Sequence, residues 1–338
     1  MNLIPKFLES HATAIGHTYD VGDYEGALDK ALEAAGYADL RAEQARRREA
    51  GDEKLLGIGV SVYVEVTGGV DPMGEAAKIE VQDVGSALVY TGTSPHGQGH
   101  DTSWSMIASD QTGIPMDKIT LIWGDTDLVP EGGGTMGSRS LQQGGAAVNK
   151  ASIELVEKAQ KLAASLLEAD EADIVLDKDN GAFHVAGTPA VAKTWADLAV
   201  AAKSQGDDLA IDTRFDAGQA TFPFGAHVSV VEVDTGTGQV KHLRQVACDD
   251  AGRVLNPMLL DGQIHGGIAQ GTAQARLADV RDDEDGTPVT THLADYGIRA
   301  ATQLPLFEVV LMQPPTFVTP LGVKGLGAAG PLGSTPAG

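Results

Sequence analysis

The sequence predicts an α+β fold, because segments with strand and helix patterns are mixed along the chain without strict alternation. Two further observations support this class. Short β-rich segments occur in pairs joined by turn residues, as at residues 83–85 and 235–238, which indicates antiparallel hairpins. Apolar residues recur every three or four positions from about Arg139 to Leu167, which indicates a long amphipathic helix. No repeat of about 20–50 residues is evident, so a solenoid is not expected.

The composition excludes several classes of protein. An apolar content of 42% and a charged content of 21% are those of a folded globular protein. The net charge of −23 argues against nucleic acid and anionic membrane surfaces as general partners. The single cysteine, Cys248, excludes an internal disulfide and cysteine-only metal sites, and it fits a cytoplasmic setting. We find no signal-peptide pattern and no apolar run of the ~18–20 residues that a transmembrane helix needs.

Residues 1–54 are expected to form a helical connector. A first helix is predicted from its apolar periodicity and ends at Gly36. Its apolar positions are Tyr24, Ala27, Leu28, Ala31, Leu32 and Ala35. A second helix, from Asp39 to about Ala50, is mostly polar, and its arginine run at 46–48 is interpreted as a solvated helix face.

Residues 55–208 are expected to form the first of two mixed α/β subdomains. Strands are predicted at 55–67, 77–82, 86–91 and 118–123 from their β-branched and aromatic residues. Helices are predicted at about 100–112, 139–167 and 194–202. A change in composition at residues 206–208 marks the predicted end of this subdomain.

Residues 209–338 are expected to form the second subdomain. Strands at 224–234 and 239–247 are joined by the turn Thr235-Gly-Thr-Gly238 and predict a hairpin. A loop at 249–257 then leads to a glycine-containing helix at about 259–278. The acidic run at 282–286 lacks the spacing of a calcium loop and is interpreted as a solvated turn.

Four glycine-rich elements are the candidates for binding chemistry. Three are loops, at residues 96–100, 132–138 and 322–330, and the fourth is the helical stretch 262–271. The first two loops precede predicted helices, whose N-terminal amides attract anions such as phosphate. Glutamines in or beside these elements supply both a donor and an acceptor, which suits a heterocyclic ligand. One such loop alone is more simply a turn, but four together favour a large, polar, phosphate-bearing ligand.

Other interpretations of the same residues are weaker. His96 and His100 have the spacing of two zinc ligands on a helix, but the glycines between them disfavour a helix there. Residues 325–330 spell the G-x-G-x-x-G of dinucleotide-binding folds without the following helix and acidic residue that this motif requires. Asp249 and Asp250 are either a carboxylate pair for acid–base work or a loop cap, and the cap is favoured. Cys248 is expected to be a buried strand residue.

These motifs, in their order along the chain, resemble those of the molybdenum-cofactor-binding large subunit of the xanthine oxidase and aldehyde oxidase family. The resemblance is greatest to the carbon-monoxide-dehydrogenase-like branch of that family, and it covers nearly the whole chain. The matching segments are TYDVGDY (18–24), GQGH (97–100), GTMGSRS (134–140), NP (256–257) with GQIHGGIAQG (262–271), and LGVKGLG (321–327). The resemblance implies that the α+β fold is the C-terminal molybdopterin-binding region of such a subunit.

The resemblance also implies a cofactor and partners. The cofactor would be molybdopterin cytosine dinucleotide with Mo, held without direct metal ligands from this chain. FAD and [2Fe-2S] clusters would lie only on flavin and iron–sulfur partner subunits, and the N-terminal half of the molybdenum subunit would be a further partner in a hetero-oligomer. The residues that match the cofactor motifs are Gly97, Gln98, Gly99, His100, Thr135, Met136, Gly137, Ser138, Arg139, Ser140, Gln263, Gln270, Lys324, Gly325 and Gly327.

The chain departs from this family in two ways. The family's large subunit is much longer, so we expect a C-terminal half-subunit, either separately encoded or truncated. The family ends its last loop with Gly-x-Gly-Glu-Ala-Gly, and its glutamate is the general base in hydroxylation or oxidation of an aldehyde, an N-heterocycle or CO with water. Here that position is Ala328. Because a general base contributes about 10²–10⁴-fold in rate, we expect a cofactor-binding half-subunit without its base; a scaffold without cofactor is the alternative.

Overall fold

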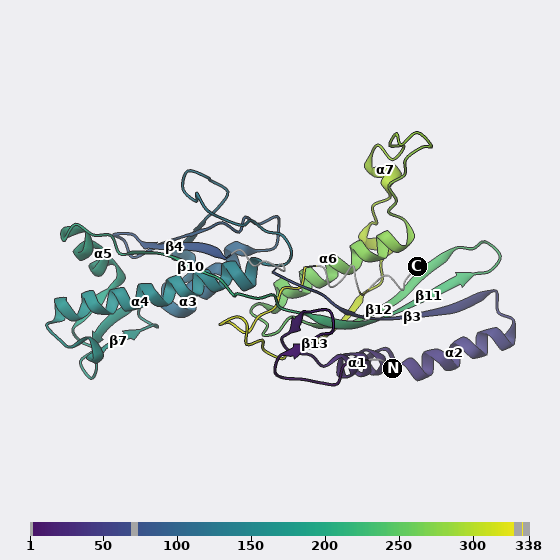
Figure 1. Ribbon diagram of the computed structural model, residues 1–338, viewed down its shortest axis with the longest axis horizontal. Coiled ribbons are helices and arrows are strands. Elements are labelled where there is room, and N and C mark those ends of the chain that lie inside the picture. The colour runs from purple at the N-terminus through teal and green to yellow at the C-terminus, as the bar shows by residue number, and fades with distance from the viewer. Residues whose placement is uncertain (1–2, 69–73, 328–332, 334–338) are drawn as a thin grey trace. The chain divides into compact units, whose positions relative to one another are not determined.

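The computed structural model describes residues 3–68, 74–327 and 333, and the chain forms two compact units (Figure 1). The first unit comprises residues 1–67, 221–318 and 322–338, and the second comprises 68–220 with 319–321. The unit boundaries therefore differ from the predicted ones after residues 54 and 208. The physical reason is that strand β3 (Lys54–Val64) pairs along its whole length with β11 (Phe224–Asp234), so segments predicted to be in separate subdomains share one sheet.

The sheet of the first unit has four strands in the order β13-β12-β11-β3. Its other strands are β12 (Val240–Asp250) and β13 (Phe307–Met312). The pairs β3–β11 and β11–β12 are antiparallel, and β12–β13 is parallel. The predicted hairpin between β11 and β12 is confirmed: Asp234 Oδ1 accepts hydrogen bonds from the amides of Gly236 and Thr237 at 3.0 and 2.9 Å.

Two helices cover one face of this sheet, and a third covers the other (Figure 1). The helices are α1 (Tyr24–Ala35), α2 (Tyr37–Ala50) and α6 (Pro257–Arg276). The buried alanines of α1 let it lie close to Phe224, Val228 and Val246 of the sheet. The first 54 residues are therefore part of the core and not a connector, although both predicted helices are present with Gly36 between them.

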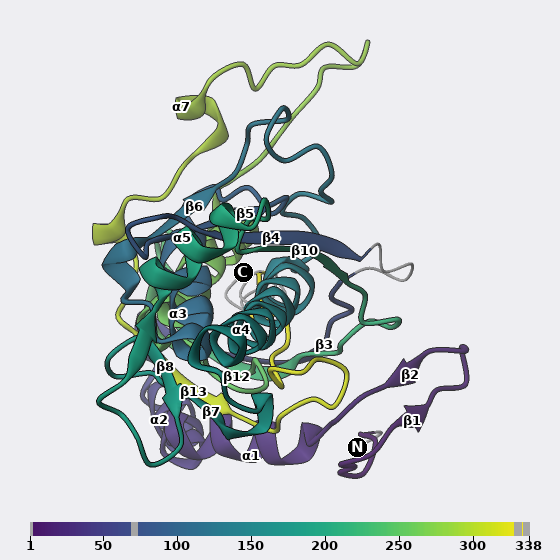
Figure 2. The same cartoon turned by 90° about the vertical axis from the view of Figure 1, so that its left-hand side faces the viewer.

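The sheet of the second unit has the order β10-β4-β5-β6, and helices α3 and α4 pack beside it (Figure 1, Figure 2). The strands are β4 (Glu75–Val81), β5 (Ala87–Thr91), β6 (Ile119–Ile122) and β10 (Ala210–Phe215), and the helices are α3 (His100–Thr112) and α4 (Ala146–Leu167). The predicted apolar stripe is buried at Val148, Ala151, Leu155 and Ala159. The long helix begins later than predicted, because residues Ser140–Gly145 form a π-helical turn, η2.

Smaller elements complete the two units. They are β1 (His11–Ala12), β2 (Thr18–Tyr19), η1 (Met116–Lys118), η3 (Glu171–Asp173), β7 (Ile174–Asp177), β8 (Ala182–Val185), β9 (Ala192–Thr194), α5 (Trp195–Ser204), α7 (Leu293–Tyr296) and η4 (Ala301–Gln303). The predicted turn at 282–286 is confirmed, since Asp283 Oδ1 accepts from the amides of Asp285 and Thr287. Within the described ranges, no helix has the length and apolar character to cross a membrane.

Candidate functional site

The first glycine loop leads directly into α3, as the sequence predicts. Gly99 is the N-cap of α3 with a φ of 78°, and no side chain caps the first turn. The amides of that turn are therefore available to a ligand. Gly97 has a φ of 111°, and a Cβ built on it meets no atom within 4 Å. A ligand can thus approach the backbone of this loop without displacing side chains of the same unit.

The side chains of this loop differ in their availability. Gln98 is half-buried, and its Oε1 accepts a hydrogen bond from the amide of His96. The ring of His100 lies 2.8 Å from the carbonyl oxygen of Thr93 through Nδ1 and stacks on Trp104 at 4.6 Å between centroids. Burial lowers the pKa of His100, so the neutral ring donates from Nδ1 to that carbonyl. Its ring contributes to packing, and its backbone amide is the group that belongs to the open first turn.

The second glycine loop also has an open backbone. Gly134 and Gly137 have φ values of 70° and 56°, and Ser138 adopts a φ of 54° that non-glycine residues rarely have. A Cβ on Gly137 meets no atom within 4 Å, and the Met136 side chain is 63% exposed. The hydroxyl of Ser140 donates to that of Thr135 at 3.0 Å. The loop is therefore internally braced while its glycine edge stays free.

Arg139, predicted to line a cofactor, is committed to a buried ion pair. Its Nη1 lies 2.6 Å from Glu75 Oε2, and the two side chains are 5% and 0% exposed. The same Oε2 accepts from the amide of Gly133 at 3.1 Å, and Nη1 donates to the carbonyl of Gly134 at 3.1 Å. Arg139 and Glu75 thus hold the second loop onto the start of β4. This makes Arg139 a residue that positions the loop rather than one that is free to contact a ligand.

Two glutamines that the sequence analysis did not select lie directly after this loop. Gln142 and Gln143 belong to the π-helical turn η2 and are fully buried. Gln143 Oε1 accepts from the amide of Ala217 at 3.3 Å, while its Nε2 has no hydrogen-bond partner in the described part of the chain. A buried donor without a partner is costly, and π-helical turns are frequent at functional sites. The sequence SLQQGG at the junction of loop and helix was the available signal.

Helix α6 of the first unit carries the predicted glutamines. Asn256 caps it by accepting from the amide of Leu259 at 3.1 Å. Ile264 and Ile268 are buried beneath the helix, whereas Gln263 is half-buried and Gln270 is exposed. A Cβ built on Gly262 or Gly266 meets no atom within 4 Å. The helix therefore presents an open glycine surface beside its glutamines.

The closing loop differs from expectation at its lysine. Lys324 is 2% exposed, and its ammonium donates to the carbonyl oxygens of Val21 and Phe222 at 3.0 and 3.2 Å. It also lies 5.2 Å from the centre of the Phe224 ring. The ammonium is thus engaged inside the protein and is not presented to an outside anion. Gly325 is buried and Gly327 is exposed, and Ala328 lies outside the described residues.

The two aspartates at the end of β12 point to opposite faces of the sheet. Asp250 caps the following turn by accepting from the amide of Gly252 at 2.8 Å, as predicted. Asp249 Oδ1 accepts from the hydroxyl of Tyr63 at 2.6 Å and lies 2.9 Å from His227 Nε2. Burial, followed by the charge of Asp249, raises the pKa of Tyr63. Neither aspartate is free for acid–base work, because both are fully buried and bonded within the core.

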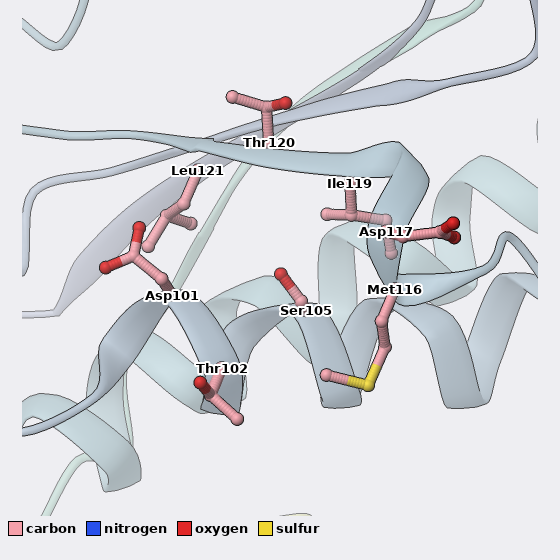
Figure 3. A pocket seen from close by; sticks show the side chains of 8 residues that line it. All are labelled: Asp101, Thr102, Ser105, Met116, Asp117, Ile119, Thr120 and Leu121. Atoms are coloured by element: carbon pink, nitrogen blue, oxygen red, sulfur yellow. The ribbon is translucent and has the colours of Figure 1, made fainter.

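An open hollow of about 430 Å³ lies between α3 and the outer side of β6 (Figure 3). Asp101, Thr102 and Ser105 of α3 line it together with Thr120 and Leu121 of β6, and the Leu121 side chain points from the strand toward the helix. None of the residues predicted to bind a cofactor lines it. The hollow begins next to the first loop, because its lining residue Asp101 directly follows His100 in the chain.

A comparison with protein families gives this geometry a context. The family model described as "Molybdopterin cofactor-binding domain" matches residues 30–305. The chain belongs to this family. The open glycine loops therefore lie in a molybdopterin cofactor-binding domain, and the predicted fold class and family are confirmed.

Curated relatives of this molybdopterin cofactor-binding domain are large subunits. The carbon monoxide dehydrogenase large chain of Hydrogenophaga pseudoflava is 37% identical over 99% of this chain and 43% of the relative. That of Afipia carboxidovorans is 35% identical over 95% of this chain and 42% of the relative. The nicotine 6-hydroxylase large subunit of Paenarthrobacter nicotinovorans is 32% identical over 95% and 41%. The chain spans less than half the length of these relatives.

Solved structures agree with this domain. The crystal structure of Cu,Mo-CO dehydrogenase superposes with a TM-score of 0.86 at 35% identity, covering 95% of this chain and 42% of that one. Quinoline 2-oxidoreductase from Pseudomonas putida 86 also has a TM-score of 0.86, at 31% identity and with 97% and 43% covered. The molybdopterin cofactor-binding domain thus retains the fold of the C-terminal region of those subunits.

Proposed function

We propose that this domain binds the molybdenum cofactor in its molybdopterin cytosine dinucleotide form, as part of a molybdenum hydroxylase-type oxidoreductase. The observation that carries the proposal is the uncovered backbone of Gly97 and Gly137, each in a glycine loop with positive φ and with open space above it. Backbone of this kind suits a dinucleotide, because amide groups can reach its phosphates only where no Cβ intervenes.

The residues of the chain divide into contacts and supports. The amides of residues 97–102 and 134–138 would hold phosphates, and Gln98, Gln143, Gln263 and Gln270 would hydrogen-bond the heterocycles. His100, Arg139 and Lys324 would act by positioning the loops, since their polar groups are bonded within the protein. Met136, Thr135, Ser138 and Ser140 complete the second loop, and Gly325 and Gly327 the closing one. The group itself, when bound, supplies two-electron redox chemistry.

The proposal includes a catalytic deficit. Ala328 occupies the position at which the resembling family has its glutamate base, and a methyl group cannot accept a proton. The assembled enzyme would therefore hold cofactor and turn over slowly. The relatives' names point to CO and nitrogen heterocycles as the substrate class to test first.

Assembly is part of the same proposal. Because the relatives are more than twice as long as the matched region, we propose that the remainder of the molybdenum subunit is a partner. Iron–sulfur and flavin subunits would remove the electrons, since the chain has a single cysteine, buried Cys248, and cannot hold an iron–sulfur cluster by cysteines. A cytoplasmic setting fits that free thiol.

Metal and nucleotide analysis of the purified complex tests cofactor binding. Molybdenum together with CMP released by acid, each near one equivalent per chain, is the expected result. GMP in place of CMP would contradict the cytosine form alone. Absence of both molybdenum and nucleotide would instead identify a scaffold subunit without cofactor.

Restoring the base tests the catalytic deficit separately. In the assembled complex, Ala328→Glu is expected to raise turnover by about 10²–10⁴-fold with unchanged molybdenum content. Ala328→Gln is the matched control, because it adds similar bulk without a proton acceptor. If the unmodified complex already turns over as fast as the glutamate variant, the proposed deficit is wrong.

A further inference from the structure

Strand β3 lies at one edge of its sheet, and in the described part of the chain β11 is its single neighbouring strand. The amides of Glu65 and Thr67 donate to the carbonyls of Pro223 and Thr221, on the β11 side. Backbone groups of alternate residues in an antiparallel pair point in opposite directions. The even-numbered residues of β3 therefore direct their N–H and C=O groups away from the sheet.

Helix α2 covers the first part of this outer edge. Gln44 Nε2 donates to the carbonyl oxygen of Leu56 at 2.8 Å, and Arg47 Nη1 donates to that of Lys54 at 3.3 Å. Both carbonyls belong to even-numbered residues, as the register requires. Beyond them, no hydrogen bond from the described residues reaches the outward groups of even positions in 58–64. Within the described part of the chain, the second half of the edge is therefore bare.

The same stretch exposes a row of valines. Val60, Val62 and Val64 are each 39% exposed, and Val66 is 43% exposed. Because side chains alternate along a strand, all four lie on one face, beside the bare backbone edge. Natural sheets protect such edges with charges, prolines, bulges or a covering element. Here the even positions from 58 to 66 carry only isoleucine and valine, which favours a partner strand over solvent.

Glu65 adds an independent observation on the other face. Its Oε2 atom is buried and has no hydrogen-bond partner among the residues that the structure describes. Burial raises its pKa to about 7, because the loss of water penalises the ionised carboxylate. A buried carboxylate oxygen without a hydrogen-bond partner destabilises the folded chain. A donor side chain on a neighbouring strand would remove that destabilisation.

We propose that the outer edge formed by the second half of β3 and the two residues after it (58–66) pairs with an extended strand from the part of the molybdenum subunit outside this chain. That strand would lay β-branched or aromatic side chains over Val60–Val66 and bring one hydrogen-bond donor to Glu65. Strand addition of this kind combines main-chain hydrogen bonds with apolar burial. The inference rests on the proposed function, in which the chain assembles with the rest of its subunit.

The length of the matched relatives favours this occupant. The matched large chains extend well beyond this one, which covers 42% and 43% of them. In those large chains, more than half of the subunit lies outside the matched region and can contact it only through its surface, of which the bare edge is a part. A second copy of the chain pairing β3 with β3 is the competing occupant, and the test separates the two.

A single introduced thiol tests the proposal. Cys248 is the chain's only cysteine and is fully buried, so Val62→Cys creates one accessible thiol. A maleimide is expected to label this thiol readily in the isolated chain. In the complex purified with the rest of the molybdenum subunit, labelling is expected to be roughly tenfold slower. Peptide sequencing of the co-purified protein identifies the rest of that subunit. Val84→Cys, 76% exposed on a turn of the second unit, is the matched control and labels equally in both states.

A charge at the same position gives a second readout. Val62→Lys is expected to leave the isolated chain folded by circular dichroism and to lower recovery of the rest of the subunit about tenfold, whereas Val84→Lys leaves recovery unchanged.

Three results would overturn the proposal: equal labelling of Val62→Cys in both states, recovery of the rest of the subunit that Val62→Lys leaves unchanged, or protection of Val62→Cys caused by dimers of the chain in sedimentation. Molybdenum and CMP are measured on the same complex. If both are present while the labelling result contradicts the β3 pairing, only the pairing is wrong and the proposed function stands.

Discussion

The ammonium of Lys324 lies 2.7 Å from Oδ2 of Asp250, and both side chains are fully buried. Burial is the main influence on Asp250 and raises the pKa of its carboxyl to about 6, with Lys324 opposing it. Asp20 Oδ2 lies 3.5 Å from the same ammonium. The cluster therefore ties the N-terminal segment and the end of β12 to the first residues of the closing loop. A loop so rich in glycine has few side chains to fix it, so this ion pair determines where it begins.

Lys324→Met is expected to destabilise the chain by about 3–5 kcal/mol, because it leaves Asp250 buried and charged without its partner. Urea unfolding of the isolated chain measures this. Lys203→Met, which removes an exposed pair with Asp83, is the control and should change stability by less than about 1 kcal/mol. Adding Asp250→Asn to Lys324→Met is expected to recover part of the loss. Equal effects of the two lysine variants would show that the buried pair contributes nothing.

The lysine also shows what sequence could and could not predict. A lone lysine in a glycine loop indicated an anion contact, because its true partners, Asp20 and Asp250, are far away in the chain. Elements fixed by local pattern were predicted well, such as α1 and the hairpin at 235–238. Pairing of β3 with β11 was not, because strand pattern does not say which strands meet.

The candidate site shows the same division. The exposed backbone at Gly97 and Gly137 could be predicted from the glycine content of the two loops. The buried side chains of His100 and Arg139 could not, because their partners, Thr93 and Glu75, belong to no recognisable motif. The orphan amide of Gln143 required the π-helical turn, which periodicity could not distinguish from the start of a regular helix.

Glu75→Gln is expected to destabilise the second unit by about 3–5 kcal/mol, since Arg139 keeps its charge in a buried setting. Thermal unfolding of the chain gives the stability, and molybdenum content after purification of the complex reports on the second loop. Glu131→Gln is the control, because Glu131 and its partner Arg214 are 73% and 54% exposed. It should change stability by at most about 0.5 kcal/mol. Retained molybdenum in a destabilised Glu75→Gln complex would mean that the ion pair does not position the loop for cofactor.

Gly97→Ala is expected to cost the isolated chain about 1–2 kcal/mol, because alanine is strained at a φ of 111°. Gly187→Ala is the matched control, with a φ of 80° and the same open surroundings. Both variants should lose similar stability, and only Gly97→Ala should lower the CMP and molybdenum content of the complex. A cofactor content that is unchanged in Gly97→Ala would remove the first loop from the binding surface.

Glu65 should make stability depend on pH. Burial penalises its ionised form, so the folded chain keeps the proton up to about pH 7, whereas the unfolded chain loses it near the ordinary value of 4.5. Between these values the folded state binds more protons than the unfolded state, and the free energy of unfolding falls as pH rises. Between about pH 5 and about pH 8, the free energy of unfolding of the unmodified chain should therefore fall by about 1–2 kcal/mol more than that of Glu65→Gln. This figure is smaller than the full pKa shift would give, because the carboxyl is partly exposed to solvent.

Urea unfolding of the isolated chain at both pH values measures this difference. The exposed Glu53, at the other end of β3, provides the control, since Glu53→Gln should follow the unmodified chain at both values. Parallel pH profiles for the unmodified chain and Glu65→Gln would mean that water or a cation already reaches Oε2. If a partner strand supplies the donor, the pKa of Glu65 falls in the complex, because a donor bonded to the carboxylate favours its ionised form. The infrared band of the protonated Glu65 carboxyl at about pH 6 should then be lost on assembly.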